Sequence, residues 1–156
     1  MTTNDLATGY HRKCEDRLAA LAVLHARAAF SDVVRESQEV VELALKGMLR
    51  WVGVDPPKIH DVGDLVLQFA DRFEGLSGGE LTALAEASKE LRKEREFSFY
   101  GDIDFIPTDE YDAEDADTAL GQARLATACL GRLLGEKRRQ SPNLARFPAG
   151  VSPGAA

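Results

Sequence analysis

VVRESQEVVELALKGMLRWV, residues 33–52, decides the fold, because its apolar and small side chains recur at intervals of three and four residues. These side chains belong to Val33, Ser37, Val41, Ala44, Leu45, Met48 and Val52. At 100° per residue they share one face of an α-helix, which predicts that this face lies in a core. Pro56 and Pro57 follow, and proline cannot continue a helix. We therefore expect the helix to end near Val52.

The same helical period continues on both sides of this segment. The expected helices cover residues 5–29, 31–52, 61–73, 81–95 and 113–137. Ser31, Asp61 and Asp112 stand where N-caps are needed, and capping is a preferred role of Ser and Asp. These features predict an all-α fold, an up-and-down bundle of four to five helices formed by residues 1–137. Residues 138–156, rich in Pro, Gly and Ala, are expected to form a disordered tail.

Length and cysteine content favour one cytoplasmic domain. A chain of 156 residues matches the size of a single domain. Cys14 and Cys129 are far apart and neither belongs to a CxxC pair, so we predict two buried free thiols. Neither a signal peptide nor an apolar stretch of the ~20 residues that span a membrane is recognisable. A cytoplasmic location without membrane contact is the expectation.

The charge is unevenly distributed. Four bases and no acid follow Glu136, so the formal charge of −7 becomes −11 for residues 1–136. A body this acidic argues against an extensive nucleic-acid surface, which needs a positive face. Residues 101–117 contain eight acids and no base, which predicts a solvated loop leading into a helix. A divalent-cation site is the alternative there, although the spacing differs from an EF-hand loop. No metal or cofactor is otherwise expected, since the three histidines are dispersed.

A second, polar ribbon follows the helix over residues 31–52. It consists of Arg35, Glu39, Glu42, Lys46 and Arg50. Glu42 and Lys46 have the favoured i,i+4 order of acid and base. The ribbon is either a salt-bridged solvent face, or Glu42 and Lys46 line a cleft with another helix. Both interpretations stay open from the sequence.

Arg95 shares a helix face with Leu84, Ser88 and Leu91. A charge on an apolar stripe needs a partner or a ligand. Alternatively, the helix ends near Arg95 and the side chain reaches water. Ser98 and Tyr100 follow closely and offer hydroxyl groups to the same pocket.

His60 and Asp61 stand at the start of an expected helix. Local capping is the expected role, with Asp61 as the cap and His60 bonding across the turn. No Ser-His-Asp arrangement, phosphate loop or Gly-rich fingerprint is recognisable in the sequence.

Taken together, these residues resemble the HEPN domain family. The matching segments are SQEVVELALKGML at 37–49, Gly53, Pro57, KIHDV at 58–62, Leu65, Arg95, YGD at 100–102, Ile106, Pro107, Tyr111 and Ala116. The resemblance covers roughly residues 5–135 and implies a helical bundle that usually dimerises. Many members are ribonucleases that use an Arg followed a few residues later by a His. Many are toxins paired with a minimal nucleotidyltransferase.

The sequence departs from this pattern at the ribonuclease motif. No His follows Arg92 or Arg95, and the aligned positions hold Ser98 and Tyr100. The imidazole best suited to proton transfer near neutral pH is therefore missing. We expect a non-catalytic protein rather than an enzyme.

The expected ligand is a nucleotide or another phosphorylated small molecule, bound in a cleft of a homodimer. The residues expected to line the cleft are Glu42, Lys46, His60, Arg95, Ser98 and Tyr100. One alternative is an interaction partner of a separate nucleotidyltransferase in a toxin–antitoxin or defence system. A second alternative is a divergent ribonuclease that uses Arg95, Tyr100 and His60.

Overall fold

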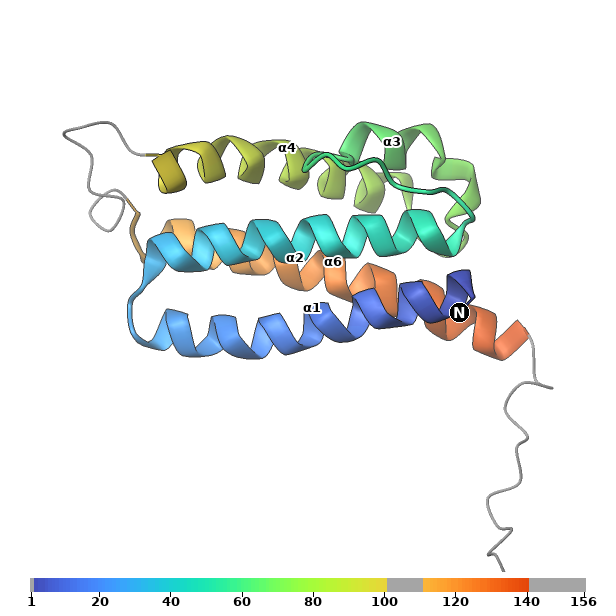
Figure 1. Cartoon of the computed structure of the whole chain (residues 1–156), viewed down its shortest axis with the longest axis horizontal. Coiled ribbons are helices and arrows are strands. Elements are labelled where there is room, and N and C mark those ends of the chain that lie inside the picture. Colours follow the sequence, from blue (N-terminus) through green and yellow to red (C-terminus); the bar gives the residue numbers. More distant parts are fainter. Residues whose placement is uncertain (1, 101–110, 141–156) are drawn as a thin grey trace, which may run out of the picture.

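The structure, a computed structural model, describes residues 2–100 and 111–140, except for the side chains of residues 92–100 and 136–140. Its elements are α1 (Thr3–Ala26), α2 (Phe30–Trp51), α3 (Gly63–Gln68), the 3₁₀ helix η1 (Ala70–Arg72), α4 (Gly78–Tyr100) and α6 (Ala113–Gln140). Strands are absent from the described part of the chain, and the long helices alternate in direction in chain order, so that α2 and α6, which pack together, run the same way (Figure 1). The predicted all-α bundle is confirmed.

Helix α2 lies at the centre of the bundle and packs against α1, α3, α4 and α6 (Figure 1). Its predicted stripe is buried from Val33 to Met48, and Val52, the C-cap, is partly buried. Because neighbours also cover its flanks, Val34, Val40 and Leu49 are buried as well. The helix that decides the fold is therefore almost completely enclosed.

The junction between α1 and α2 differs from the prediction. Ser31 was expected to cap the second helix, but α2 begins at Phe30, with Ala29 as an N-cap that makes no side-chain hydrogen bond. Ala28 adopts a φ of 56°, so one left-handed residue reverses the chain. Ser31 is instead buried within the first turn of α2. At the other end of α1, Thr2 and Asp5 form a capping box.

Helix α3 is shorter than the expected helix at 61–73. It begins at Gly63, after Val62 as N-cap, so the predicted cap at Asp61 is one residue too early. Asp61 Oδ1 still accepts a hydrogen bond from the N–H of Gly63 at 3.0 Å. A Cβ atom at Gly63 would lie 2.9 Å from both Cα and O of Ala85. Glycine therefore allows α3 to pack directly on the backbone of α4.

Other sequence predictions have mixed outcomes. Cys14 and Cys129 are free and buried, as predicted. Asp112 caps α6 by accepting a hydrogen bond from the N–H of Asp115 at 2.9 Å, also as predicted. Helix α6 continues through Gln140, three residues into the segment expected to be a tail, and residues 141–156 lie outside the described part. Across the described residues, no helix combines the length and the apolar character that a bilayer crossing requires.

Candidate functional site

Glu42, Lys46 and His60 form a compact polar cluster beside α2. Lys46 Nζ donates to Glu42 Oε1 at 2.8 Å. His60 Nδ1 lies 2.9 Å from Glu42 Oε2, and because a carboxylate only accepts, Nδ1 is the donor. The side chains of Glu42 and Lys46 are 12% and 15% exposed, whereas His60 is 59% exposed. The Glu42–Lys46 pair on α2 is therefore largely buried, and His60 is the exposed member of the cluster.

This burial decides between the two interpretations of the polar ribbon at Glu42 and Lys46. A solvent face does not describe these two residues, because both side chains are largely buried and His60 from another segment contacts Glu42. The arginines at the two ends of the ribbon form ion pairs of their own. Arg35 pairs with Glu36 and Arg50 pairs with Asp55, each at 3.1 Å. Contacts with residues outside α2 thus occur in the middle of the ribbon, at Glu42, and at its C-terminal end, where Arg50 also lies over the ring of Tyr10 on α1.

Asp61 ties the same segment to α4. Its Oδ1 accepts a hydrogen bond from the buried Ser88 Oγ at 2.8 Å, in addition to the bond from Gly63. His60 reaches Glu42 on α2, a contact between residues 18 apart that the expected local role at the turn did not include. Adjacent residues therefore bind two different helices, which fixes His60 over Glu42.

The electrostatics keep Glu42 ionised. Burial raises the pKa of this carboxyl, but the hydrogen bonds and the charges of Lys46 and His60 outweigh it, so the pKa lies below its usual value. An ionised Glu42 holds the Lys46 ammonium in one position through a charge-assisted hydrogen bond. The Lys46 ammonium has three donors, and its bond to Glu42 uses one of them.

Arg95, Ser98 and Tyr100 lie on the last turns of α4. The helix continues through Tyr100, so the alternative in which it ends near Arg95 is wrong. The side chains of these three residues lie outside the described part of the chain. At 1.5 Å per residue, Arg95 is roughly 10 Å along α4 from Ser88.

Measured from the level of Ser88, Lys46 lies toward the opposite end of the bundle from Arg95. It is one turn beyond Glu42, toward the C-terminal end of α2, and α2 and α4 are antiparallel (Figure 1). Within one chain the backbones at Lys46 and Arg95 are therefore separated by roughly 15 Å along the bundle axis. Glu42, Lys46 and His60 come together, whereas the positions of Arg95, Ser98 and Tyr100 form a second group.

The HEPN domain family model matches residues 8–137. The chain belongs to the HEPN domain family. No curated protein and no solved structure matches it. In this HEPN domain the matched residues span α1 to α6, so the cluster on α2 and the last turns of α4 both lie inside the family region.

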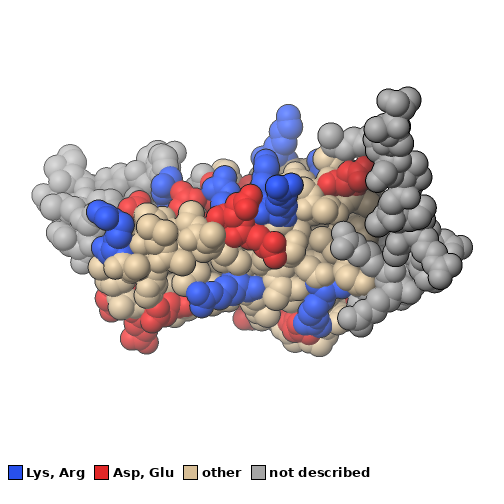
Figure 2. All heavy atoms as spheres, turned by 90° about the horizontal axis from the view of Figure 1, so that it is seen from below, with Lys and Arg blue, Asp and Glu red and all other residues tan. Residues whose placement is uncertain are grey.

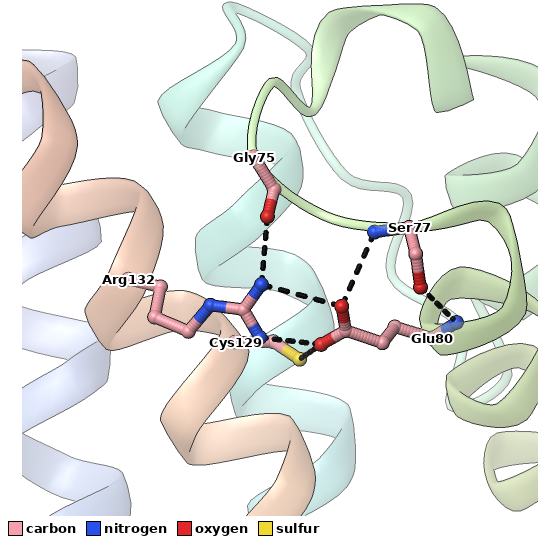
Figure 3. Close-up of polar contacts among 5 residues, drawn as sticks. All are labelled: Gly75, Ser77, Glu80, Cys129 and Arg132. Carbon is pink, nitrogen blue, oxygen red and sulfur yellow. Dashed lines mark hydrogen bonds and ion pairs between the residues drawn. The ribbon is translucent and has the colours of Figure 1, made fainter.

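A second polar cluster of the HEPN domain was missed by the sequence analysis. Arg132 on α6 donates to Glu80 Oε2 at 2.5 Å and to the carbonyl of Gly75 at 2.6 Å (Figure 3). Ser77 and Glu80 form a capping box at the start of α4, with bonds of 3.1 and 3.2 Å. The Ser-x-x-Glu spacing was a usable signal for this cap. Arg132 is 52 residues away from Glu80, and no local pattern indicates their contact.

The charges of this second cluster indicate a structural role. Hydrogen bonds from Arg132 and Ser77 lower the pKa of Glu80 to about 2. Burial and the nearby Glu80 raise the pKa of the Cys129 thiol to about 11. A thiol with so high a pKa is a poor nucleophile at neutral pH. We therefore regard the cluster as a connection between α4 and α6 rather than as a reactive site.

A cavity of about 220 Å³ opens among α2, α4 and α6, near the end of the bundle where α4 terminates. Its acidic lining residues are Glu90, Glu114 and Asp115. Negative charge disfavours a phosphate inside this cavity and favours a cation. Among the side chains that the structure describes, no three of His, Cys, Asp or Glu are grouped to hold a metal ion. Four of the eight acids on which the cation-site alternative depends belong to residues 101–110, which lie outside the described part of the chain.

Proposed function

We propose that this HEPN protein binds a nucleotide or a similar phosphorylated ligand in a cleft at a homodimer interface, without catalysing a reaction. The observation that carries the proposal is the enclosed Lys46 ammonium, held at 2.8 Å by Glu42. A cation in a partly desolvated position attracts phosphate more strongly than an exposed lysine does. The exposed ring of His60 marks the edge from which a ligand approaches Lys46.

The separation between the two groups of candidate residues supports a dimeric site. Lys46 and Arg95 are too far apart along one bundle for both to contact one phosphate, given the roughly 15 Å between their backbones. A second copy of the chain, packed antiparallel, brings its own α4 end toward the α2 cluster of the first. In that arrangement Arg95 meets phosphate bidentately and Lys46 acts as a point charge. Ser98 and Tyr100 then supply hydroxyl groups to the ligand.

The absence of catalysis is part of the proposal. A general base must come within hydrogen-bonding reach of the proton that it removes. His60, the imidazole of the cluster, donates through Nδ1 to Glu42, which leaves Nε2 as the nitrogen able to accept a proton. Its level on the bundle is roughly 10 Å from that of Arg95. A ribonuclease mechanism that uses both residues on one scissile phosphate is thus less well supported than binding.

The test is a thermal-shift series with nucleoside mono-, di- and triphosphates, each with and without magnesium. A ligand at 100 times its dissociation constant stabilises by about 2.7 kcal/mol. For a chain of this size that is a rise in Tm of roughly 5–10 °C. Lys46→Gln removes the positive charge from the cluster and should abolish the rise. Lys13→Gln, on the exposed surface of α1, is the matched control and should retain it.

Arg95→Ala separates binding from structure at the second group. A variant that keeps the parent Tm without ligand but loses the nucleotide-dependent rise supports a phosphate contact. A nucleotide-dependent rise equal to that of the parent removes Arg95 from the site. If no nucleotide shifts the parent, the binding proposal is wrong, and the nucleotidyltransferase-partner alternative becomes the better explanation. Cleavage of single-stranded RNA that His60→Ala abolishes would instead establish the ribonuclease alternative.

A further inference from the structure

The cavity among α2, α4 and α6 is lined by acids and by no base. Its acids are Glu90 on α4 and Glu114 and Asp115 on α6, which we call the cavity acids, and all three are exposed to solvent. Charges of both signs are interspersed elsewhere, as Figure 2 shows for the face that carries α1. The cavity therefore has a local excess of negative charge that no other lining residue balances.

Acids at other contacts between helices are paired with arginine. Arg17 on α1 donates to Glu36 on α2 at 3.0 Å, and Arg132 on α6 donates to Glu80 on α4 at 2.5 Å. Within the described part of the chain, none of the three cavity acids forms an ion pair. A cation from outside the protein would give these carboxylates the partner that the other interhelical acids already have.

The cavity acids keep oxygen atoms available for such a ligand. Gln122 Nε2 donates to Glu90 Oε2 at 3.3 Å, which engages one of the two oxygens of Glu90. Asp115 Oδ2 accepts a hydrogen bond from the N–H of Asp112 at 3.0 Å. The side chain of Glu114 accepts no hydrogen bond from any residue that the structure describes. Each carboxylate therefore has at least one oxygen that a donor can approach.

Size and polarity select the class of cation. A compact metal ion fits poorly, because no three of the described acids converge on one point. The floor of the cavity consists of the buried apolar side chains of Val34, Leu91 and Ala119. Its volume of about 220 Å³ lies below the roughly 300–1,000 Å³ of most cofactor pockets, and it equals roughly seven water molecules at about 30 Å³ each. A short methylene chain with an ammonium group at each end matches all three features.

We propose that the cavity binds a short aliphatic diamine between α4 and α6. The methylene groups contact the apolar floor, and the two ammonium groups donate to Glu90 and Glu114, which lie on different helices. Such charge-assisted hydrogen bonds are about twice as strong as neutral ones. The ligand thereby connects the start of α6 with α4 near the end of the bundle where α4 terminates (Figure 1).

This site is separate from the Glu42 cluster and does not depend on the proposed nucleotide binding. Val34, through which α2 contributes to the cavity, precedes Glu42 by eight residues, which is roughly 12 Å along the helix. The two sites also prefer ligands of opposite charge, since the cavity is acidic whereas Lys46 offers a cation. Failure of one proposal therefore leaves the other standing.

The test is isothermal titration calorimetry of the full chain with diaminobutane, with butylamine and butanol as matched ligands. We expect one diaminobutane to bind per chain and its affinity to fall as sodium chloride is added. Butylamine lacks the second ammonium group and should bind about tenfold more weakly, as the loss of one hydrogen bond between charged groups predicts. Butanol, which has no charge, should show no binding. Equal affinity for butylamine and diaminobutane would overturn the two-ended contact.

Variants locate the binding in the cavity. Glu90→Gln and Glu114→Gln each remove one charge at nearly constant shape and should weaken diaminobutane binding by about tenfold. Glu86→Gln, an exposed acid one turn earlier on α4 that does not line the cavity, is the matched control and should bind as the parent does. Circular dichroism without ligand should show the parent helix content for all three variants, since all three positions are exposed.

Four results would overturn the proposal. The first is a parent protein that does not bind diaminobutane. The second is an unchanged affinity in both cavity variants, and the third is an equal loss in all three variants, which would indicate general attraction to an acidic protein. The fourth is displacement of the diamine by an equal concentration of magnesium chloride, which would assign the cavity to a metal ion.

Discussion

Replacement of Gly63 by alanine tests how tightly α3 is seated on α4. The added Cβ would lie 2.9 Å from both Cα and O of Ala85, and 3.2 Å from its Cβ. Two of these three atoms are backbone, so no side-chain rotation relieves the contact, and α3 must move. Overpacking of a fitted contact usually costs about 1–3 kcal/mol. Alanine in a helix gains up to about 1 kcal/mol over glycine, which offsets only part of that cost. We therefore expect a net loss of about 1–2 kcal/mol.

The assay is urea unfolding followed by circular dichroism, with Gly121→Ala as the matched control. Gly121 is a helical glycine in α6 at which an added Cβ meets nothing within 4 Å. The control should gain up to about 1 kcal/mol in free energy of unfolding, because only the helix propensity changes. A Gly63→Ala protein as stable as the parent, with Gly121→Ala also stabilised, would refute the close packing of α3 on α4.

Two further predictions concern the polar contacts between segments. The pKa of Glu80 is about 2 in the folded protein and about 4.3 in the unfolded chain. A carboxyl with such a lowered folded pKa stabilises the fold fully above its unfolded pKa. This stabilisation is lost as the pH falls toward the folded pKa. The Tm difference between the parent and Glu80→Gln should therefore shrink between pH 5 and pH 2, and a difference independent of pH would contradict the ion pair with Arg132. Ser88→Ala removes the buried hydroxyl that donates to Asp61 at 2.8 Å and should cost about 1 kcal/mol in urea unfolding. An unchanged midpoint would show that the hydrogen bond contributes nothing to holding the segment.

The centre of the bundle was predictable from the sequence because its signal is local. The three- and four-residue spacing over 33–52 predicted the buried face of α2, and the i,i+4 order predicted the Glu42–Lys46 contact. The start of α2 was mispredicted for a conformational reason. A left-handed backbone at Ala28 makes the turn, so the side chain of Ser31 is not needed as a cap.

The contacts that complete the site depend on residues distant in the sequence. His60 is 18 residues from Glu42, Ser88 is 27 residues from Asp61, and the capping rule that favours Asp61 describes neither contact. The capping rule anticipated only the hydrogen bond that Asp61 accepts from the N–H of Gly63. Which helices the 52–62 segment meets depends on how α3 packs on α4, and no local pattern carries that information.

Different interactions hold the two parts of the Glu42 cluster in place. Their contributions to nucleotide binding can therefore be tested separately. Glu42 and Lys46 belong to the enclosed helix α2, whose position is fixed by the apolar core. His60 belongs to an exposed segment fixed by two polar contacts and by the seating of Gly63. Gly63→Ala therefore displaces His60 while leaving the pair on α2 intact, and Lys46→Gln removes the cation while leaving the segment in place. If Lys46 binds phosphate and His60 only borders the entrance, Lys46→Gln must weaken nucleotide binding far more than Gly63→Ala does.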